Sequence, residues 1–524
     1  MNRLLCILAA SVAVLISCGK QQEDKPLPKA LILTVKVDGV AVINGGSIGE
    51  VSTSPQIVLE FSRDIAYDEV SMACLAYSGG ALKGRVSGSI LTLTPVEPLQ
   101  PFTRYGLGVP VGSCFGVDLV EGFSFSFTTS YDASDKFPRI ADEELLTLVQ
   151  AQTFKYFWDY AHPASGMARE RLGSGNTVTS GGSGFGIMCL PVAVERGFVT
   201  REAAAERMRK ILSFLSSADR FHGAWSHWID GNTGKALPFS TKDDGGDLVE
   251  TSFMMQGLLT AGQYFDRADE EDIRTMIKEL WEGVEWDWYT QGKNVLYWHW
   301  SPTYNWEMNM AIRGWNEALI TYILAASSPT HPVSADVFKK GWGTFKFPVA
   351  TDQPLFFSHY SFLGLDPRNL SDSNGSYWEQ NVAHAQYNYD YCVRNPKHHA
   401  GYSASSWGLT ASDIPGGYSA SAPANDKGVI APTAALSSMP YLPGQAMSAL
   451  RTFYYMYGDK LWGEYGFHDA FSMDARWFAS SYIAIDQGPI VVMIENYRTQ
   501  LLWNLFMQDQ DVVAGLEKLG FTSK

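Results

Sequence analysis

Three carboxylates stand close together near the middle of the sequence. Asp244 and a pair of glycines separate Asp243 from Asp247, and Glu250 comes three residues after Asp247. The glycines permit a sharp turn into a helix that starts at Asp247, so Asp247 and Glu250 would share one face of that helix. An acidic helix start of this kind also stabilises many helices without any catalytic role. Three carboxylates beside one turn favour the wall of an active site that works by acid–base catalysis.

A second acidic cluster lies between residues 297 and 319. Glu317 is at the start of a predicted helix beside Trp315, where loss of solvent would raise its pKa and suit it to donate a proton. Glu307 is the alternative proton donor in this cluster. Either carboxylate could instead be an ion-pair partner of Arg313, which would be a structural role. The segment supplies these further candidates for substrate contacts: Trp298, His299, Arg313, Trp315 and Asn316.

Aromatic side chains in loop-like segments indicate a sugar ligand, because the apolar face of a pyranose ring stacks on an aromatic ring. The candidate stacking platforms are Trp228, Trp407 and Tyr418, although each could instead pack in the core. A polar cluster nearer the C-terminus adds His468, Asp469 and Gln487 as candidate contacts.

The net charge and the absence of several known motifs exclude further classes of ligand and reaction. The 524 residues carry a formal net charge of −15 at pH 7, and binding to phosphate backbones requires clustered Lys and Arg. We therefore expect a neutral substrate and no nucleic-acid partner. The sequence has no His-Glu-x-x-His motif, no Gly-x-Ser-x-Gly elbow and no phosphate-binding loop, and the adjacent His398 and His399 lack the spacing of metal ligands. We expect no metal, no other cofactor and a monomeric protein.

The N-terminus has the pattern of a lipoprotein signal. A basic start and an apolar run lead to Leu15-Ile16-Ser17-Cys18, which resembles the lipobox of bacterial lipoproteins. The apolar run is too short to span a bilayer, so Cys18 would hold the protein through lipid alone. Residues 1–18 are then the signal peptide, residues 19–28 a tether, and the outer membrane of the cell envelope the predicted location, on either face. An ordinary secretory peptide with a chance cysteine is the alternative.

The rest of the chain divides by its periodicity. Residues 29–130 alternate apolar and polar residues in short runs, which predicts a small all-β sandwich resembling bacterial Ig-like domains. Within it, Cys74 and Cys114 could form a disulfide, and free buried thiols are an equal alternative. Residues 131–140 are a predicted linker, and residues 141–524 form a second domain.

Helical periodicity dominates this second domain. It predicts helices over residues 143–160, 201–215, 247–265, 270–288, 316–326, 444–456 and 489–506, separated by long loops rich in Gly, Trp, His and Asp. Long loops in a compact domain are usually functional, so we expect paired helices in an (α/α)6 toroid whose loops line a cleft. The predicted fold class is therefore mainly α, preceded by the small all-β domain. No repeat period supports an α-solenoid.

Several motifs of the second domain resemble glycoside hydrolase family 144, whose members are called glucoamylase-like. In order, they are Asp-Gly-Gly-Asp-Leu-Val-Glu-Thr (244–251), Tyr-Trp-His-Trp-Ser-Pro (297–302), Gly-Trp-Asn-Glu-Ala-Leu-Ile (314–320), Ser-Pro-Thr-His-Pro (328–332) and Asp-Gln-Gly-Pro-Ile (486–490). The resemblance covers about residues 142–521. It implies an (α/α)6 barrel that acts as an inverting endo-β-1,2-glucanase and releases sophoro-oligosaccharides. The acidic positions implicated by analogy with the family are Asp243, Asp247, Glu250 and a further Glu, placed here at Glu317.

The roles of these carboxylates follow from the geometry that inversion needs. An inverting hydrolase has an acid and a base about 6.5 to 9.5 Å apart, with a water molecule between the base and the sugar. Asp247 and Glu250, one helical turn apart, are too close to be that pair. We expect Glu317 as the general acid, Asp243 or Asp247 on the side of the water, and Glu250 orienting them.

Two other classes of protein share parts of this pattern. A polysaccharide lyase can use a helical toroid, but it needs an acidic glycan and basic residues at the cleft, and few stand near these motifs. A non-catalytic surface glycan-binding lipoprotein would keep the aromatic residues and could dispense with the carboxylates. The two features together favour a hydrolase.

Overall fold

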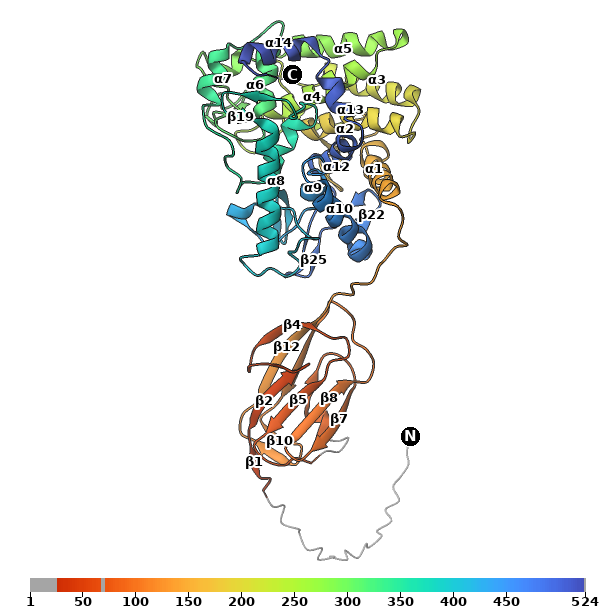
Figure 1. Ribbon diagram of the computed structural model, residues 1–524, viewed down its shortest axis with the longest axis vertical. Helices are drawn as coiled ribbons and strands as arrows, with labels where there is room; N and C mark the ends of the chain where they lie inside the picture. The colour runs from red at the N-terminus through yellow and green to blue at the C-terminus, as the bar shows by residue number, and fades with distance from the viewer. Residues whose placement is uncertain (1–25, 67–70, 523–524) are drawn as a thin grey trace, which may run out of the picture. The chain divides into compact units, whose positions relative to one another are not determined.

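The computed structural model describes residues 26–66 and 71–522, and these form two compact units (Figure 1). The boundary falls between Asp132 and Ala133, inside the predicted linker. The signal peptide 1–18 with Cys18, and the tether up to residue 25, lie outside the described residues. Among the residues described, none of the helices has the length and apolar character needed to cross a membrane.

The N-terminal unit is a β-sandwich. One antiparallel sheet has the order β3-β2-β5-β8-β7, and a second has the order β4-β12-β9-β6, in which β4 and β12 are parallel. A short third sheet has the order β1-β11-β10, with bounds β1 Lys29–Ala30, β10 Gly112–Cys114 and β11 Val117–Leu119. The strand bounds are β2 Ile32–Val37, β3 Val40–Ala41, β4 Ser47–Val51, β5 Ile57–Phe61, β6 Ala76–Tyr77, β7 Leu82–Ser87, β8 Ile90–Pro95, β9 Arg104–Val109 and β12 Phe123–Thr129. Alternate apolar residues such as Leu59 and Phe61 are buried between the sheets, which explains the period-two pattern. Cys74 and Cys114 are joined in a disulfide.

The C-terminal unit is mainly helical, with short two- and three-stranded sheets in its loops, and its helices form two layers (Figure 1). Helices α2, α4, α6 and α12 are buried on nearly every side, as their all-round apolar sequences require, and α2 packs on both α4 and α12. Helices such as α3 and α5 bury one face and form the outer layer. The principal bounds are α1 Asp142–Trp158, α2 Ser180–Glu195, α3 Arg201–Ser217, α4 Leu248–Tyr264, α5 Glu271–Glu282, α6 Leu319–Ser327, α7 Ala335–Gly341, α8 Tyr377–Arg394, α9 Pro432–Leu436, α10 Pro443–Arg451, α11 Gly458–Leu461, α12 Ala484–Arg498, α13 Leu501–Phe506 and α14 Gln510–Leu519.

Glycines let the inner helices α2 and α4 touch backbone to backbone. A Cβ atom on Gly184 would lie 2.3 Å from the carbonyl oxygen of Phe253, and one on Gly257 would lie 2.2 Å from the carbonyl oxygen of Gly184. Only glycine permits so close an approach. The contact fixes the first turns of α2 and α4 beside each other, and the functional site is built on those turns.

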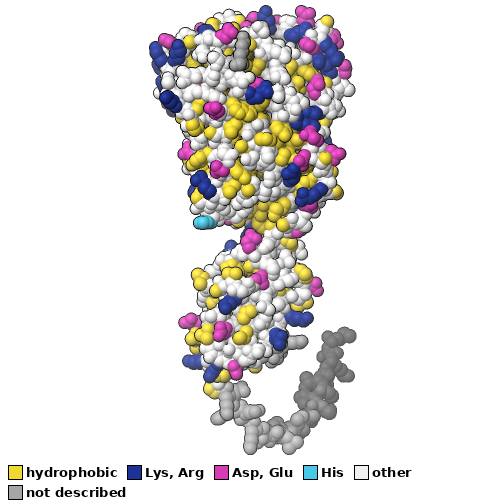
Figure 2. Space-filling model, in the orientation of Figure 1, with side chains coloured by type: hydrophobic (Ala, Val, Ile, Leu, Met, Phe, Trp, Pro, Cys, Tyr) yellow, Lys and Arg dark blue, Asp and Glu magenta, His cyan; other side chains and the backbone are white. Residues whose placement is uncertain are grey.

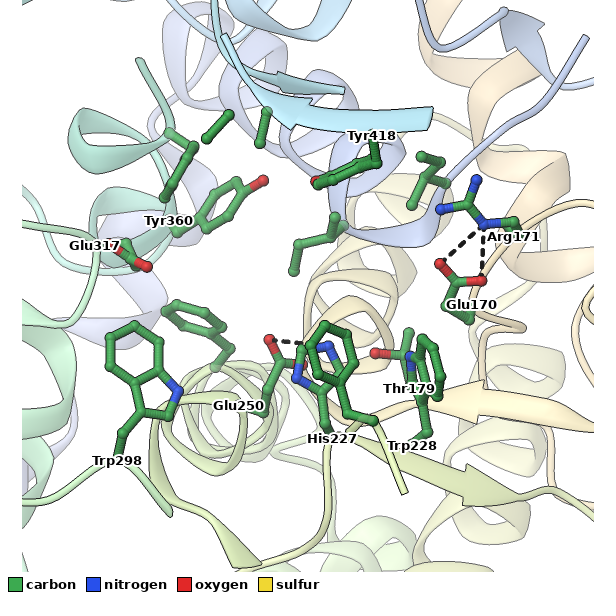
Figure 3. A pocket seen from close by; sticks show the side chains of 17 residues that line it. Glu170, Arg171, Thr179, His227, Trp228, Glu250, Trp298, Glu317, Tyr360 and Tyr418 are labelled. Atoms are coloured by element: carbon green, nitrogen blue, oxygen red, sulfur yellow. Dashed lines mark hydrogen bonds and ion pairs between the residues drawn. The ribbon is translucent and has the colours of Figure 1, made fainter. Parts of the chain in front are cut away.

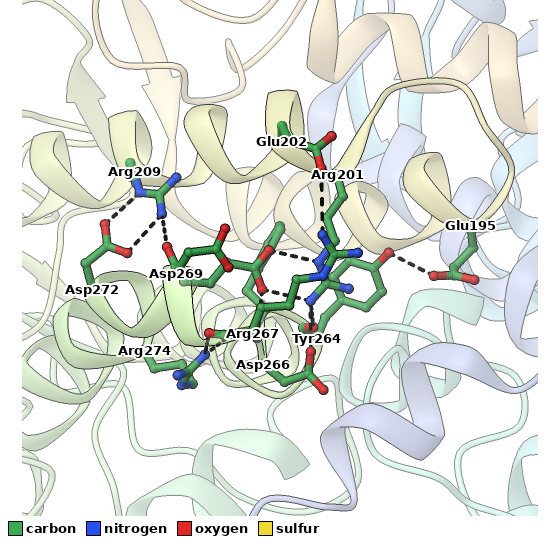
Figure 4. Close-up of polar contacts among 12 residues, drawn as sticks. Glu195, Arg201, Glu202, Arg209, Tyr264, Asp266, Arg267, Asp269, Asp272 and Arg274 are labelled. Atoms are coloured by element: carbon green, nitrogen blue, oxygen red, sulfur yellow. Dashed lines mark hydrogen bonds and ion pairs between the residues drawn. The ribbon is translucent and has the colours of Figure 1, made fainter.

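Ion pairs align the outer helices α3 and α5 (Figure 4). Arg201 at the start of α3 binds Glu270 at 2.8 Å, and Arg209 binds Asp272 at 2.6 Å. Glu270 is buried, so its pair is shielded from solvent, whereas the exposed Arg209–Asp272 pair contributes little to stability. The C-terminal ends of these two helices lead into the loops 218–247 and 283–318, which carry most of the functional side chains.

The helix predicted over residues 270–288 is shorter in the structure. Helix α5 ends at Glu282, and Gly283 is its C-cap. Val284 and Trp286 are fully buried, so the chain turns inward after Gly283 to place them in the core. Only a short 3-10 helix, η3 (Trp288–Thr290), follows, and the predicted helix was wrong beyond residue 282.

Candidate active site

A pocket of about 450 Å³ lies where the inner helices begin (Figure 3). Its walls are mainly aromatic, and they include Trp228, Phe239, Phe253, Trp298, Phe356, Tyr360 and Tyr418. Its carboxylates are Glu170, Glu250 and Glu317. A concave, largely apolar pocket with a few polar groups is the usual form of a small-molecule site, and its ring faces suit a sugar.

Asp247 is the N-cap of α4 and is fully buried. One carboxylate oxygen accepts hydrogen bonds from the backbone amides of Val249 and Glu250, and the other accepts one from His227 at 3.2 Å. Burial alone would favour the neutral carboxyl, but the contacts with His227 and His299 hold the pKa of Asp247 well below its usual range. Asp247 is therefore a fixed anion whose oxygens are both occupied.

Two histidines, His227 and His299, form ion pairs with the acidic residues Asp243 and Asp247. His299 on β17 (His299–Trp300) lies 3.1 Å from Asp243 and 3.6 Å from Asp247. Burial opposes protonation of both rings, yet the adjacent carboxylates raise the pKa of His299 to about 10 and that of His227 to about 9. Both imidazoles are thus cations at neutral pH.

These charges also bear on metal binding. His227, Asp243 and Asp247 each offer a ligand atom, and the three atoms lie within 4.8 Å of one another. A metal ion needs the neutral imidazole as its ligand. Because protonated His227 already supplies positive charge at this point, the arrangement fits an ion-pair cluster better than a metal centre.

Glu250 reaches the pocket from the first turn of α4. Its Oε2 accepts a hydrogen bond from the backbone amide of Gly181 at 2.7 Å, and its Oε1 lies 4.0 Å from Nε2 of His227. Burial raises the pKa of Glu250 above its usual value. A Cβ atom on Gly181 would lie only 2.5 Å from Oε2, so the glycine is needed for this contact.

Glu317 reaches the same pocket from another segment, two residues before α6. Figure 3 shows Glu317 and Glu250 pointing into one opening from different elements. Burial raises the pKa of Glu317 to about 7, and the charge on Glu250 contributes to the shift. A carboxyl group that stays protonated near neutral pH is suited to donate a proton.

Known proteins resemble the helical unit that holds this pocket, both in sequence and in fold. A family model described as "Putative glucoamylase" matches residues 309–510. A solved endo-β-1,2-glucanase from Chitinophaga pinensis, in complex with sophorotriose and glucose, is 52% identical with a TM-score of 0.71, covering 74% of this chain and 99% of that chain. The chain belongs to glycoside hydrolase family 144. The predicted resemblance and the helical toroid are therefore confirmed.

Two further relatives of this family 144 chain come from Parabacteroides distasonis. A solved β-1,2-glucanase is 38% identical with a TM-score of 0.71, covering 94% of this chain and 74% of that chain. An exo-β-1,2-glucooligosaccharide sophorohydrolase, acting at the non-reducing end, is 46% identical over an alignment 419 residues long that covers 72% of this chain. The match spans only 58% of the length of that sophorohydrolase.

Several residues that the sequence analysis predicted for the site of this family 144 domain do not line the pocket. Glu307 is exposed and pairs with Lys242 at 2.6 Å, so it does not face the cavity as a proton donor would. Arg313 is exposed and donates to the carbonyl oxygen of Lys340 rather than pairing with Glu307. Asn316 accepts a hydrogen bond from the backbone amide of Ala318, which is a local turn contact.

Other predicted contacts are core residues. Trp315 is buried among aromatic rings, and Trp407 is fully buried with its Nε1 donating to the carbonyl oxygen of Gln445. His468 contacts the carbonyl oxygen of Lys460, and Gln487 donates to that of Phe467. None of these four lines the pocket, because each side chain packs against or hydrogen-bonds to a neighbouring segment instead.

Asp469 supports the pocket from behind. Its Oδ2 accepts a hydrogen bond at 2.6 Å from the backbone amide of Asp413, on the hairpin of β20 (Ala411–Ile414) and β21 (Gly417–Ala420). That hairpin carries Tyr418, which lines the pocket as predicted. Burial raises the pKa of Asp469 to about 7 and also raises that of its neighbour Asp486, so the two buried carboxyls hold protons readily.

The sequence analysis missed His227 and the pair Glu170–Arg171. His227 stacks on Phe239 with ring centroids 4.2 Å apart and joins Asp247 to Glu250. Arg171 binds both oxygens of Glu170 and lies 3.0 Å from Asp413. A signal for His227 was present, since it adjoins Trp228 in a loop rich in Gly and Trp, but its partners are 20 or more residues away.

Proposed function

We propose that this protein is an inverting endo-β-1,2-glucanase that cleaves linear β-1,2-glucan and releases sophoro-oligosaccharides. The observation that carries the proposal is the pair of carboxyls, Glu317 and Glu250, facing one aromatic pocket from separate elements. Burial raises the pKa of both carboxyls, to about 7 for Glu317, but their environments differ, because Glu250 alone accepts the amide hydrogen bond of Gly181 and lies near the His227 cation, which opposes the rise. Paired carboxyls in unequal environments are the basis of acid and base roles in glycosidases.

The proposed reaction assigns one proton transfer to each of the two. Glu317 donates its proton to the glycosidic oxygen as the bond from that oxygen to the anomeric carbon breaks. A water molecule attacks the anomeric carbon from the opposite side, and Glu250 accepts the proton that this water loses. The products are two shorter chains, one of which gains a hydroxyl of inverted configuration.

This assignment differs from the one expected from the sequence, in which Asp243 or Asp247 was on the side of the water. Asp247 uses both oxygens within the protein and has a strongly lowered pKa, which makes it a poor base. We assign Asp247 to positioning His227 and the first turn of α4. Asp243, bound to His299, is assigned to the same positioning cluster.

A neutral substrate is supported by the charges at the pocket. The two cationic side chains of its lining, Arg171 and His227, are both paired with carboxylates, so no free cation is offered to a uronate. On the face of the helical unit that Figure 2 presents, Lys, Arg, Asp and Glu side chains are interspersed rather than gathered by sign. Binding of a polyanion would require a cluster of one sign.

The choice of internal cleavage rests on the relatives. The C. pinensis protein, named as an endo-β-1,2-glucanase, is matched along 99% of its chain. The sophorohydrolase is matched along 58% of its length, so a large part of that protein lies outside the match. The proposal of internal cleavage therefore follows the relative that is matched along nearly its whole length.

The test uses the purified protein lacking residues 1–18. It is incubated with linear β-1,2-glucan and, in parallel, with β-1,3-glucan, starch and polygalacturonate. A ladder of sophoro-oligosaccharides from β-1,2-glucan alone is expected, with α-configured reducing ends in early proton NMR spectra. Sophorose as the sole early product would establish exo action, and unsaturated uronate products would establish a lyase.

The location of the protein is a separate proposal. We propose that Cys18 is acylated and that the protein is a monomer held at the outer membrane by lipid alone. Labelling with a radioactive fatty acid should mark the full-length protein and not Cys18→Ala, and light scattering of the soluble form should give the monomer mass. An unlabelled wild type would indicate an ordinary secretory peptide.

A further inference from the structure

Among the residues that the structure describes, Trp288 is the one exposed tryptophan. The sequence has 16 tryptophans, all within the described residues, and 15 of them are buried or half-buried. Trp288 has 41% of its surface exposed and lies in η3, in the loop after α5. An indole ring left in water keeps a large apolar area available for a ligand that can stack on it.

The ring is held in a fixed orientation. The imidazole of His222 stacks on it at a centroid distance of 3.8 Å and an interplanar angle of 15°. His222 is itself fixed, since its Nδ1 lies 2.8 Å from a carboxylate oxygen of Glu285 and its carbonyl oxygen accepts from the backbone amide of Glu285. Trp306 flanks the indole at 6.2 Å. Because His222 covers one face of Trp288, the opposite face is the one open to a ligand.

The exposed ring is connected to the pocket through neighbouring aromatic side chains. Trp298 lines the pocket, and Trp300 follows two residues later on β17, about 6 to 7 Å along a strand. The ring of Trp300 contacts the imidazole of His222 edge-on, with centroids 5.3 Å apart, and His222 in turn stacks on Trp288. A chain that extends beyond the pocket on this side is therefore within reach of Trp288.

We propose that the open face of Trp288 is an accessory site that stacks on a glucosyl ring of the β-glucan chain, outside the pocket in which the chain is cut. The nature of the ligand rests on the proposed function. Exposed carboxylates of Glu285 and Asp287 beside the ring can accept hydrogen bonds from sugar hydroxyls. A stacking face with hydrogen-bond acceptors at its edge fits a neutral sugar.

The accessory site favours long chains. A chain bound at Trp288 keeps its neighbouring segment at a high effective concentration near the pocket, whereas a short oligosaccharide occupies one site at a time. The gain appears as a lower KM for the polymer, because Trp288 does not touch the bond that is cut. The structure thus supplies a physical reason for preferring polymeric substrate.

The kinetic test compares two substrates of the same linkage. The ratio of kcat/KM for long β-1,2-glucan to kcat/KM for a sophoro-oligosaccharide just long enough to be cut is measured for wild type, Trp288→Ala and Trp288→Phe. We expect this ratio to fall about fivefold to tenfold in Trp288→Ala, mainly through KM, and less in Trp288→Phe, which keeps a ring. Tyr497→Ala removes a ring that is 40% exposed on α12 and serves as the matched control.

A binding test is independent of cleavage. Glu317→Gln, with and without Trp288→Ala, is run on native gels containing β-1,2-glucan, β-1,3-glucan or no glucan, and the Tm of each variant is recorded. Retardation by glucan that Trp288→Ala weakens at unchanged Tm supports the site. An unchanged kinetic ratio with unchanged retardation overturns it, and so does a change of oligomeric state in Trp288→Ala, which would reveal a protein interface. If wild type cleaves no glucan, the proposed function fails, and Trp288-dependent retardation on the gels still decides the accessory site.

Discussion

Asp247 binds His227 through one carboxylate oxygen at 3.2 Å and caps helix α4 with the other. The same residue thus fixes the half-buried His227 cation and the helix turn that presents Glu250. The relationship explains why an aspartate at this position serves the site without facing the pocket. Asp247 therefore has two roles that can be tested separately: it caps helix α4, and its negative charge stabilises the His227 cation.

Asp247→Ala removes both roles, and we expect it to lower the free energy of unfolding by about 3 to 5 kcal/mol, because it removes a buried carboxylate that caps α4 and hydrogen-bonds the half-buried His227. Asp247→Asn keeps a good N-cap and should cost less. In both variants the pKa of His227 should fall from about 9. Urea denaturation and an NMR titration of the histidine measure the two effects.

The matched control for the cap is Asp509→Ala. Asp509 caps α14 through the amides of Asp511 and Val512 and has no histidine partner. Loss of such a cap costs about 0.5 to 2 kcal/mol. Equal losses in Asp247→Ala and Asp509→Ala would contradict the role given to the His227 pair.

Glu317→Gln should reduce kcat on β-1,2-glucan by about 10²-fold to 10⁴-fold, since the amide cannot donate the acidic proton. In wild type, activity should decline as the pH rises through about 7, where Glu317 loses its proton. Reducing-end assays across pH measure both effects. Glu307→Gln is the matched control, because that exposed carboxylate lies outside the pocket. A loss of similar size in Glu307→Gln would reverse the assignment.

Glu317 should also make stability depend on pH. Its pKa is about 7 in the folded protein against an ordinary value of 4.5, so between these values the folded state binds more protons than the unfolded state. The stabilising contribution is complete below pH 4.5 and is lost as the pH rises through about 7. Calorimetry over this range should show that the Tm of Glu317→Gln, relative to the Tm of wild type, increases as the pH rises. A difference that stays constant would show that burial does not shift this group.

Gly181→Ala should impair catalysis through Glu250. The added Cβ atom would lie 2.5 Å from Oε2 of Glu250 and would displace that carboxylate from its amide hydrogen bond. We expect kcat to fall at least tenfold while the Tm changes by a few degrees. Gly262→Ala on the same helix as Glu250 is the control, because its Cβ atom would meet Ile277 at an ordinary 3.6 Å. Full activity of Gly181→Ala would show that the contact is dispensable.

Several features of the fold could be read from local sequence. Alternation with a period of two in residues 29–130 and helical periodicity afterwards identified the two units, because burial of one face imposes these periods on neighbouring residues. The glycine pair before Asp247 likewise predicted a helix start, and Asp247 is the N-cap of α4. The helix over 270–288 failed past residue 282, because buried Val284 and Trp286 turn the chain inward against its local preference.

The sequence by itself determined which residue types could do the chemistry and that the acid and the base had to come from different segments; it placed the base at Asp243 or Asp247, and the structure moved that proposed role to Glu250. It could not decide between Glu307 and Glu317, or distinguish the buried Trp407 from the exposed Trp288, because exposure depends on which distant segments pack against each side chain. Tertiary structure alone brought His227 to Asp247 and His299 to Asp243. Those contacts join loops that follow different helices, and the close packing of the inner ring is what sets them at hydrogen-bond distance.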